Sequence, residues 1–458
     1  MVQSRCPQSP DRVIVDIPDA DARAVESAAA EARSVGREWY RAGAPARAEA
    51  LAAAAEKLAA ASEELTRLMI DEVGKPATEA RGEAARSVAI MRYFAQQAFE
   101  PDGETLPPAG PRTLLYSRRR PHGVAGLITP WNFPAAIPLW KAAPALAYGN
   151  AVLLKPAPEA TAVALRLAEL LGEALPSGLF RVVPGGGETG RAVVGAADCV
   201  SFTGSAEAGH AVAMAATHRS LPIQAEMGGL NASIVLPDAD LENAAPSVAA
   251  AAMGYAGQKC TATSRVIVVG DETRQSQVRE ALAAAVECMR VGDPAEDTTA
   301  VGPLILEEAR DAVVAAADGA RSDGARVLTG GGREDRFGWY AQPTLVADVP
   351  ADNRLVNEEV FGPICAIQTA RDIGQAIQLN NAVRYGLVTS VYSNDLNVAF
   401  DALDEIDTGL VRVNAPTSGV DFWAPFGGEK ASSYGPREQG KAAQNFYTTT
   451  QTLTVGPN

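Results

Sequence analysis

Residues 123–156, GVAGLITPWNFPAAIPLWKAAPALAYGNAVLLKP, decide the fold. The segment begins with a short apolar run, GVAGLITP, and ends with another, AVLLKP, and glycine and proline bound both runs as they bound buried strands. The longer stretch between them, AIPLWKAAPALAYG, favours a helix. A strand, a helix and a second strand in this order predict two parallel strands joined by a crossover helix.

The same alternation continues along the chain. Helices are expected at 159–175 and 206–217, and strands at 179–185 and 199–205. A second series of strands and helices begins after about residue 230. Repeats at this spacing predict an α/β protein with a doubly wound parallel sheet.

The two ends of the chain follow other patterns. Residues 20–68 are rich in Ala, Glu and Arg, with apolar residues at helical spacing that predict two long amphipathic helices, and residues 77–100 predict a third. TLLYSRRR (113–120) predicts a strand. NFYTTTQTLTV (445–455) alternates and predicts an edge strand that pairs with another subunit.

Composition excludes several classes of function. A formal net charge of −15, without any run of five basic residues, argues against nucleic acid and anionic membranes as partners. Five widely spaced cysteines and three histidines argue against a disulfide framework or a metal site and for a reducing compartment. No signal-peptide pattern and no run of 18 apolar residues occurs. These observations predict a cytoplasmic protein.

Polar residues and glycines stand where the predicted strands end, the edge at which such sheets bind ligands. Asn132 either offers its amide N–H to a substrate oxygen or caps the next helix. Lys155 either extends its ammonium group to solvent or holds an anion or a ribose. Gly204 and Ser205 open a helix and would offer donors to a phosphate, although the segment SFTGSAEAG (201–209) is not GxGxxG. Gly185 lies in a further glycine turn.

Three further motifs carry chemistry. Cys260, in GYAGQKCTATSR (254–265), is surrounded by glycine and small polar residues and is a candidate thiolate nucleophile. Glu226 precedes two glycines and is either a general base or a capping or salt-bridged carboxylate. In NEEVFGPI (357–364), Glu359 and Phe361 could hold a ribose and press on a flat ring.

Taken in order, these motifs resemble those of the NAD(P)-dependent aldehyde dehydrogenase superfamily. They are PWNFP, KP, FTGS, EMGG, GQKC, EEVFGP, NAPTSG and PFGGEK, and the resemblance runs from about residue 20 to the C-terminus. It implies an α/β fold with three parts: a Rossmann-type cofactor domain (1–104 and 122–228), an α/β catalytic domain (229–431) and a small β oligomerisation element (105–121 and 432–458). The implied assembly is a homodimer or homotetramer.

The resemblance also implies a role for each motif. Cys260 attacks the aldehyde to form a thiohemiacetal, Asn132 and the Cys260 N–H hold the oxyanion, and Glu226 activates the water that hydrolyses the resulting thioester. The implied cofactor contacts are Trp131, Lys155, Gly185, Gly204, Ser205, Glu359 and Phe361. The implied substrate funnel contains Trp140, Lys259, Thr261, Ser418, Val420, Phe422 and Phe426. No metal is implied.

Within the superfamily, the chain is most similar to 2-oxoglutarate semialdehyde (2,5-dioxovalerate) dehydrogenases, which carry a basic residue before the cysteine. Here that residue is Lys259, which either lowers the thiol pKa and attracts an acidic substrate or points away. The aromatic residues Phe422, Trp423 and Phe426 favour the alternative of an aryl or hydrophobic aldehyde. Glu226 argues against a CoA-acylating enzyme, and the complete catalytic set argues against a non-catalytic relative.

The chain departs from the family pattern at three places. Leu230 and Ala232 replace the usual Lys and Pro after EMGG, and the N-terminus is short, so no opening strands are expected. Pro158 stands where many NAD-preferring members have a Glu that binds the adenosine ribose. Without that carboxylate, repulsion of a 2′-phosphate is relieved, which favours NADP over NAD, although the adjacent Glu159 could partly substitute.

Overall fold

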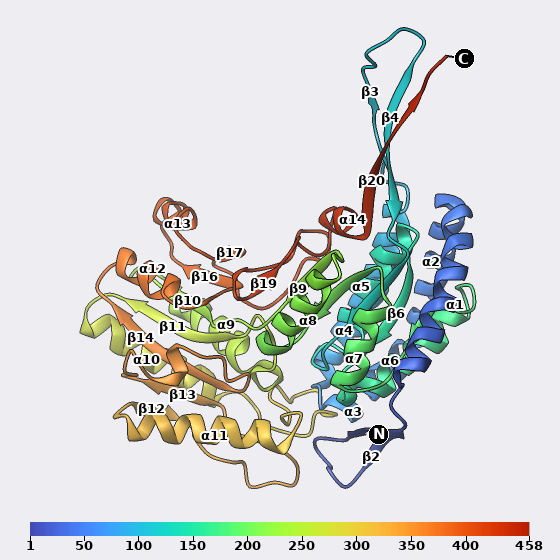
Figure 1. Ribbon diagram of the computed structural model, residues 1–458. Coiled ribbons are helices and arrows are strands. Elements are labelled where there is room, and N and C mark those ends of the chain that lie inside the picture. The colour runs from blue at the N-terminus through green and yellow to red at the C-terminus, as the bar shows by residue number, and fades with distance from the viewer. Residues whose placement is uncertain (458) are drawn as a thin grey trace.

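The computed structural model describes residues 1–457, in which two α/β lobes lie side by side and a long β arm projects from one of them (Figure 1). The predicted α/β class is therefore confirmed. No helix among these residues is long and apolar enough to cross a membrane.

The first lobe is built on a six-stranded sheet. Its order is β19-β9-β8-β5-β6-β7, and all neighbours are parallel except β19 and β9. The strands are β5 (Val124–Ile128), β6 (Ala151–Lys155), β7 (Phe180–Val182), β8 (Cys199–Thr203), β9 (Ile223–Glu226) and β19 (Ser433–Tyr434). The chain passes from β5 outward to β7 and then returns to β8 on the other side of β5. Such a switch point opens a crevice at the carboxyl ends of β5 and β8.

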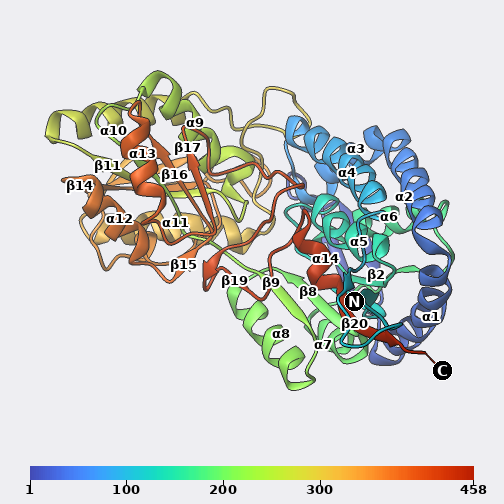
Figure 2. The same cartoon turned by 90° about the horizontal axis from the view of Figure 1, so that it is seen from above.

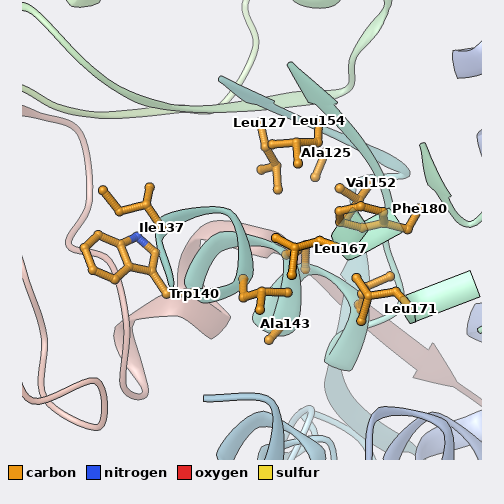
Figure 3. Packing of buried hydrophobic residues seen from close by; sticks show 14 of the residues in the cluster. Ala125, Leu127, Ile137, Trp140, Ala143, Val152, Leu154, Leu167, Leu171 and Phe180 are labelled. Atoms are coloured by element: carbon orange, nitrogen blue, oxygen red, sulfur yellow. The ribbon is translucent and has the colours of Figure 1, made fainter. Parts of the chain in front are cut away.

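Helices cover both faces of this sheet. They are α1 (Ala22–Arg41), α2 (Gly43–Ala60), α3 (Ser62–Val73), α4 (Ala77–Gln97), α5 (Ala136–Ala147), α6 (Thr161–Gly172), α7 (Gly187–Ala196) and α8 (Ala206–His218). In Figure 3, Leu127 and Leu154 from β5 and β6 face Ala143 from α5, while Val152 and Phe180 lie near Leu171 from α6. The opening segment 123–156 thus forms the strand, helix and strand that were predicted.

The region 20–68 differs from its prediction, because it enters three helices rather than two. The first break falls at Gly43, whose φ of 85° suits glycine. The second falls at Ala61, whose ψ of 7° ends α2. No glycine or proline interrupts the alanine-rich sequence at that position. Helical periodicity therefore predicts one continuous helix across α2 and α3.

The second lobe holds a seven-stranded sheet with its own core. Its order is β12-β13-β14-β11-β10-β16-β17, and only β12 and β13 are antiparallel. The strands are β10 (Asn231–Val235), β11 (Thr263–Val269), β12 (Arg326–Thr329), β13 (Thr344–Ala347), β14 (Ile364–Ala370), β16 (Val388–Tyr392) and β17 (Leu410–Val413). The helices are α9 (Leu241–Met253), α10 (Glu272–Glu287), α11 (Glu307–Ser322), α12 (Ile373–Asn381) and α13 (Leu396–Leu403). A short ribbon pairs β15 (Tyr385–Gly386) with β18 (Glu429–Lys430).

The arm is a three-stranded antiparallel sheet with β4 (Leu114–Pro121) between β3 (Thr105–Leu106) and β20 (Thr448–Val455). The predicted C-terminal edge strand is confirmed for 448–455, whereas 445–447 belong to helix α14 (Ala442–Tyr447). The expectation that no strands open the chain is wrong. β1 (Val2–Arg5) pairs with β2 (Val13–Ile17), because two short extended runs suffice for a hairpin packed near α3 and α6.

Candidate active site

The site lies where the two lobes meet, seen from above in Figure 2. β9 ends at Glu226 and β10 begins at Asn231, so only four residues link the carboxyl edge of the first sheet to the amino edge of the second. Cys260 lies just before β11, which pairs with β10. This short link brings Cys260 to the crevice at the ends of β5 and β8.

The cysteine turn has an unusual backbone. After α9 the chain enters a 3₁₀ turn, Gly254–Gly257, in which Tyr255 and Ala256 have φ of 56° and 52°. Left-handed geometry costs such residues about 1–2 kcal/mol each. At Gly257, with φ of 65°, a Cβ would lie 2.2 Å from the Gly362 carbonyl oxygen. The turn therefore requires glycine at position 257. The cost of the two left-handed residues is offset by the packing and hydrogen bonds around the turn.

Asn231 holds the other side of the turn. Its Nδ2 donates to the Cys260 carbonyl at 2.8 Å and to the Ala262 carbonyl at 2.9 Å, and its Oδ1 accepts from the Val388 N–H at 3.2 Å. The sequence motif EMGGLN ends at this residue, and it was not among the predicted site residues. A conspicuous polar residue at the start of a buried strand is the signal that could have found it.

Asn132 lies against the same turn. Its Nδ2 donates to the Gln258 carbonyl at 2.9 Å, which leaves the second amide hydrogen for a ligand. The alternative that Asn132 caps α5 is wrong, because the N–H groups of Ala135 and Ala136 donate to Glu83 at 2.9 Å. The side chain of Asn132 is buried and directed at the cysteine turn.

Two cavities meet at Cys260, whose side chain is half-buried between them. The first, of about 280 Å³, opens at the ends of β5 and β8, and its predicted lining residues are Trp131, Asn132, Gly204, Ser205, Glu359 and Phe361. The second, of about 450 Å³, opens against α4, and its predicted lining residues are Trp140, Lys259, Thr261, Ser418 and Val420. A group bound in either cavity reaches the sulfur.

The first cavity has the features of a nucleotide site. Thr203, at the end of β8, has a buried hydroxyl with no hydrogen-bond partner within residues 1–457. Ser205 caps α8, whose first N–H groups face the crevice. Trp131 and Phe361 pack edge to face with centroids 5.8 Å apart. These residues fit a dinucleotide with an aromatic ring near Cys260.

Glu359 lies at the wall of this cavity. Its Oε1 accepts from the Gly229 N–H at 3.1 Å, and a Cβ at Gly228 would lie 1.9 Å from its Oε2. Gly228 therefore lets the carboxylate lie against the backbone. Burial raises the pKa of Glu359 to about 7.

Lys155 and Gly185 lie outside that lining but contact each other at the ends of β6 and β7. The Lys155 Nζ donates to the carbonyls of Gly185 at 2.8 Å and Pro156 at 2.6 Å. Burial lowers the pKa of Lys155 to about 8 against the attraction of Glu159. The ammonium group is therefore held inside rather than extended to solvent.

Burial and nearby carboxylates both disfavour the thiolate form of Cys260. Burial first, and then Glu359 and Glu226, raise the pKa of the thiol to about 12. Burial and the neighbouring Glu438 also raise the pKa of Glu226 well above its usual range, against the hydrogen bond that Ser433 donates to Glu226 Oε2 at 2.6 Å. A raised pKa makes the ionised carboxylate a stronger proton acceptor, which suits a general base.

Lys259 is not among the main influences on the thiol pKa, which are burial and the neighbouring carboxylates. Its Nζ lies 2.5 Å from Glu79 Oε1 on α4, so its charge is already compensated. Burial is the largest single influence on Glu79 and opposes its ionisation, but the combined attraction of Lys259, Lys75 and Arg86 lowers the pKa of Glu79. Glu79 lies 180 residues before its partner, and no local pattern indicates the pair.

Two aromatic residues of the expected funnel lie behind the second cavity. Phe426 is buried and packs on Trp140 with centroids 5.7 Å apart. Phe422 packs between Tyr93 and Trp423, at centroid distances of 5.7 and 4.8 Å. Neither lines the cavity. The aromatic residues that do line the cavity are Trp140, as expected, and Phe133, which the sequence did not place there.

Comparisons with known proteins agree with this site. The sequence pattern of the aldehyde dehydrogenase family matches residues 1–453, so the match begins about 20 residues earlier than expected. The α-ketoglutaric semialdehyde dehydrogenase of Bacillus subtilis is 36% identical over 100% of this chain and 95% of its own length. The α-ketoglutarate semialdehyde dehydrogenase of Haloferax volcanii is 38% identical over 98% and 94%.

A solved structure shows the same architecture. Betaine aldehyde dehydrogenase from Staphylococcus aureus, in complex with NAD⁺, superimposes with a TM-score of 0.95 at 31% identity and covers 100% of this chain and 91% of its own. The motifs, the two cavities at Cys260 and the full-length matches point the same way. The chain belongs to the aldehyde dehydrogenase family and is an NAD(P)-dependent aldehyde oxidoreductase.

Proposed function

We propose that the protein oxidises an ω-oxo acid of the α-ketoglutarate semialdehyde class to the dicarboxylic acid by thioester hydrolysis. The observation that carries the proposal is the meeting of two cavities at Cys260, one suited to a dinucleotide and one to the aldehyde. The two semialdehyde relatives named above support the substrate class.

The chemistry follows from the residues around Cys260. Glu226, a carboxylate near the sulfur, takes the proton of the Cys260 thiol and passes it to solvent. The thiolate adds to the aldehyde carbon, and the oxyanion is stabilised by the free amide hydrogen of Asn132 and the Cys260 N–H. NAD(P)⁺ bound in the first cavity supplies the hydride acceptor. Loss of hydride from the thiohemiacetal carbon leaves a thioester on Cys260. Glu226 then takes a proton from the water that attacks the thioester, which releases the acid and regenerates the thiol.

Hydrolysis rather than transfer to CoA is supported by Glu226, a buried carboxylate with a raised pKa. An aromatic aldehyde is the weaker alternative, since Phe422 and Phe426 lie outside the substrate cavity.

For the cofactor we propose that both forms are used, with a lean to NADP because Pro158 leaves no carboxylate at that position. Glu159, on the 3₁₀ turn Pro158–Ala160, lies close enough to Lys155 to raise its pKa and limits the preference. For the assembly we propose a homodimer or homotetramer joined through the arm, whose β20 has a free edge.

One panel of assays tests these proposals. We expect kcat/KM to be highest for 2,5-dioxopentanoate, lower for succinic semialdehyde and lowest for benzaldehyde, with NADP⁺ at least one tenth as effective as NAD⁺. The Cys260→Ala variant should lose NAD(P)H formation with every aldehyde. Highest activity on benzaldehyde would contradict the substrate class, and a tenfold or greater preference for NAD⁺ would contradict the cofactor lean.

A further inference from the structure

One face of α4 forms the wall of the substrate cavity opposite the cysteine turn. Thr78 and four further residues of this helix line the cavity. The four lie at spacings of three and four, which places them on a single stripe: Glu79, Gly82, Glu83 and Arg86. Lys259 and Thr261 line the opposite side. The charges on this stripe therefore meet the far end of an aldehyde whose carbonyl lies at Cys260.

Both carboxylates of the stripe already have cationic partners. Glu79 pairs with Lys259 at 2.5 Å. Glu83 pairs with the fully buried Lys75 and also caps the start of α5. Arg86 also attracts Glu79, but more weakly than Lys259 does, and neither carboxylate forms a direct ion pair with Arg86 within residues 1–457.

Arg86 differs from its neighbours. It is half-buried, it lines the cavity, and it has neither a hydrogen bond nor an ion pair within residues 1–457. Three cations, Lys75, Lys259 and Arg86, stand against two carboxylates in this region. The wall therefore carries one uncompensated positive charge, and the charge lies on a guanidinium group that can bind a carboxylate with two parallel hydrogen bonds.

The position of Arg86 suits a substrate of several carbons. It lies two turns after Glu79, about 10 Å along the helix axis. Helix side chains lean toward the N-terminus, which directs Arg86 over Gly82 and toward the cysteine turn. A Cβ at Gly82 would meet nothing within 4 Å, so the guanidinium has room there. Arg86 and Cys260 line the same cavity, so a molecule with an aldehyde at one end and a carboxylate at the other can meet both residues.

We propose that Arg86, and not Lys259, binds the distal carboxylate of the substrate and determines the preference for ω-oxo acids over neutral aldehydes. The inference rests on the proposed substrate class, and it assigns the recognition to a residue 174 positions before the catalytic cysteine rather than to the neighbour of that cysteine.

The test compares 2,5-dioxopentanoate with pentanal, a neutral aldehyde of the same length, in steady-state assays. Arg86→Gln and Arg86→Met should each lower kcat/KM for the oxo acid about 10- to 100-fold, mainly through KM, and should lower it less than threefold for pentanal. Arg86→Lys should show a smaller loss than these two variants, because lysine keeps the positive charge but lacks the planar guanidinium group that forms two parallel hydrogen bonds. Glutarate should inhibit the wild type competitively and the Arg86→Gln variant at least tenfold more weakly.

Arg92→Gln is the matched control. Arg92 lies on the same helix but pairs with Glu56 at 2.8 Å, outside the cavity. This change should therefore alter kcat/KM by no more than twofold for either substrate. Unchanged melting temperatures establish that the Arg86 variants fold. Equal losses for both substrates, or a selective loss in Lys259→Gln with none in Arg86→Gln, would overturn the assignment. If the wild type does not prefer the oxo acid over pentanal, the proposed substrate class itself falls.

Discussion

Glu226 depends on a hydroxyl group that comes from far along the chain. Ser433 Oγ donates to Glu226 Oε2 at 2.6 Å across 207 residues of sequence. In the β19–β9 pair, Ser433 stands directly opposite Glu226. This hydrogen bond stabilises the ionised carboxylate and so lowers the pKa of Glu226. It is the strongest influence in that direction, whereas burial and Glu438 raise the pKa.

Replacing Ser433 with Ala should move the pH dependence of thioester hydrolysis. Loss of the bond raises the pKa of Glu226 further, because the ionised carboxylate loses a hydrogen-bond donor. Glu226 accepts a proton only when ionised, so activity is present above its pKa and is lost as the pH falls through it. The rising limb of kcat against pH should therefore shift to higher pH.

The matched variant is Ser433→Thr, which keeps the hydroxyl and should leave the limb in place. Both variants are measured between pH 5.5 and 9.5 with the same aldehyde. An unshifted limb in Ser433→Ala would show that the bond does not act on the ionisation of Glu226.

At this scale the sequence predicts residues that belong to local motifs. Cys260, Asn132 and Glu226 stand beside glycines, prolines or strand ends, and these settings are visible in a few letters of sequence. Glu79 and Ser433 lie in ordinary helical or loop sequence, and their partners are 180 and 207 residues away. Their roles come from tertiary pairing, for which no local pattern exists.

At the scale of an element, α4 combines a structural and a functional surface. Gly82 is exposed in the interior of this helix, has no left-handed φ, and lines the substrate cavity. Glycine is a poor helix former, so its presence costs stability. The gap that it leaves keeps the cavity open on the side of α4.

Substitution of Gly82 should therefore separate stability from activity. Gly82→Ala should stabilise the protein by about 0.5–1 kcal/mol, measured from the shift of the denaturant midpoint. Gly82→Leu should fold but raise KM for 2,5-dioxopentanoate at least fivefold, because the longer side chain enters the cavity.

Gly319 in α11 provides the comparison, since it is also exposed, and a Cβ there meets nothing within 4 Å. Gly319→Ala should give a similar gain in stability, and Gly319→Leu should leave KM unchanged. Unaltered KM in Gly82→Leu would mean that substrate does not approach this face of α4.

Elements were predictable to different degrees for physical reasons. The parallel strands were clear because they are buried on both faces and read as apolar runs between glycines and prolines. The break between α2 and α3 was not, because alanine supports the helix on both sides of it. β19 has only two residues, and its sequence does not predict a strand. A strand this short is defined by its pairing with β9 and not by its own composition.

At the scale of the whole molecule, the arm extends beyond the body, and its β20 has one edge without a partner (Figure 1). An unpaired edge exposes backbone N–H and C=O groups that a second subunit could satisfy. Deletion of residues 448–458 should therefore lower the mass measured by sedimentation velocity from that of a dimer or tetramer toward that of a monomer.

A shorter deletion, of residues 456–458, removes only the chain after β20 and should leave the assembly intact. Retention of the full mass by the 448–458 deletion would place the subunit contact elsewhere on the molecule.

The place of β19 has a consequence for how the protein is made. Ribosomes add about 5–20 residues per second, so roughly 10–40 s pass between the synthesis of Glu226 and that of Ser433, 207 residues later. During that interval the outer edge of β9 has no neighbour, and the lobe that binds the cofactor cannot be completed. A nascent chain of this enzyme therefore carries an open strand edge until its last few dozen residues emerge, which makes it a candidate client for chaperones that shield such edges.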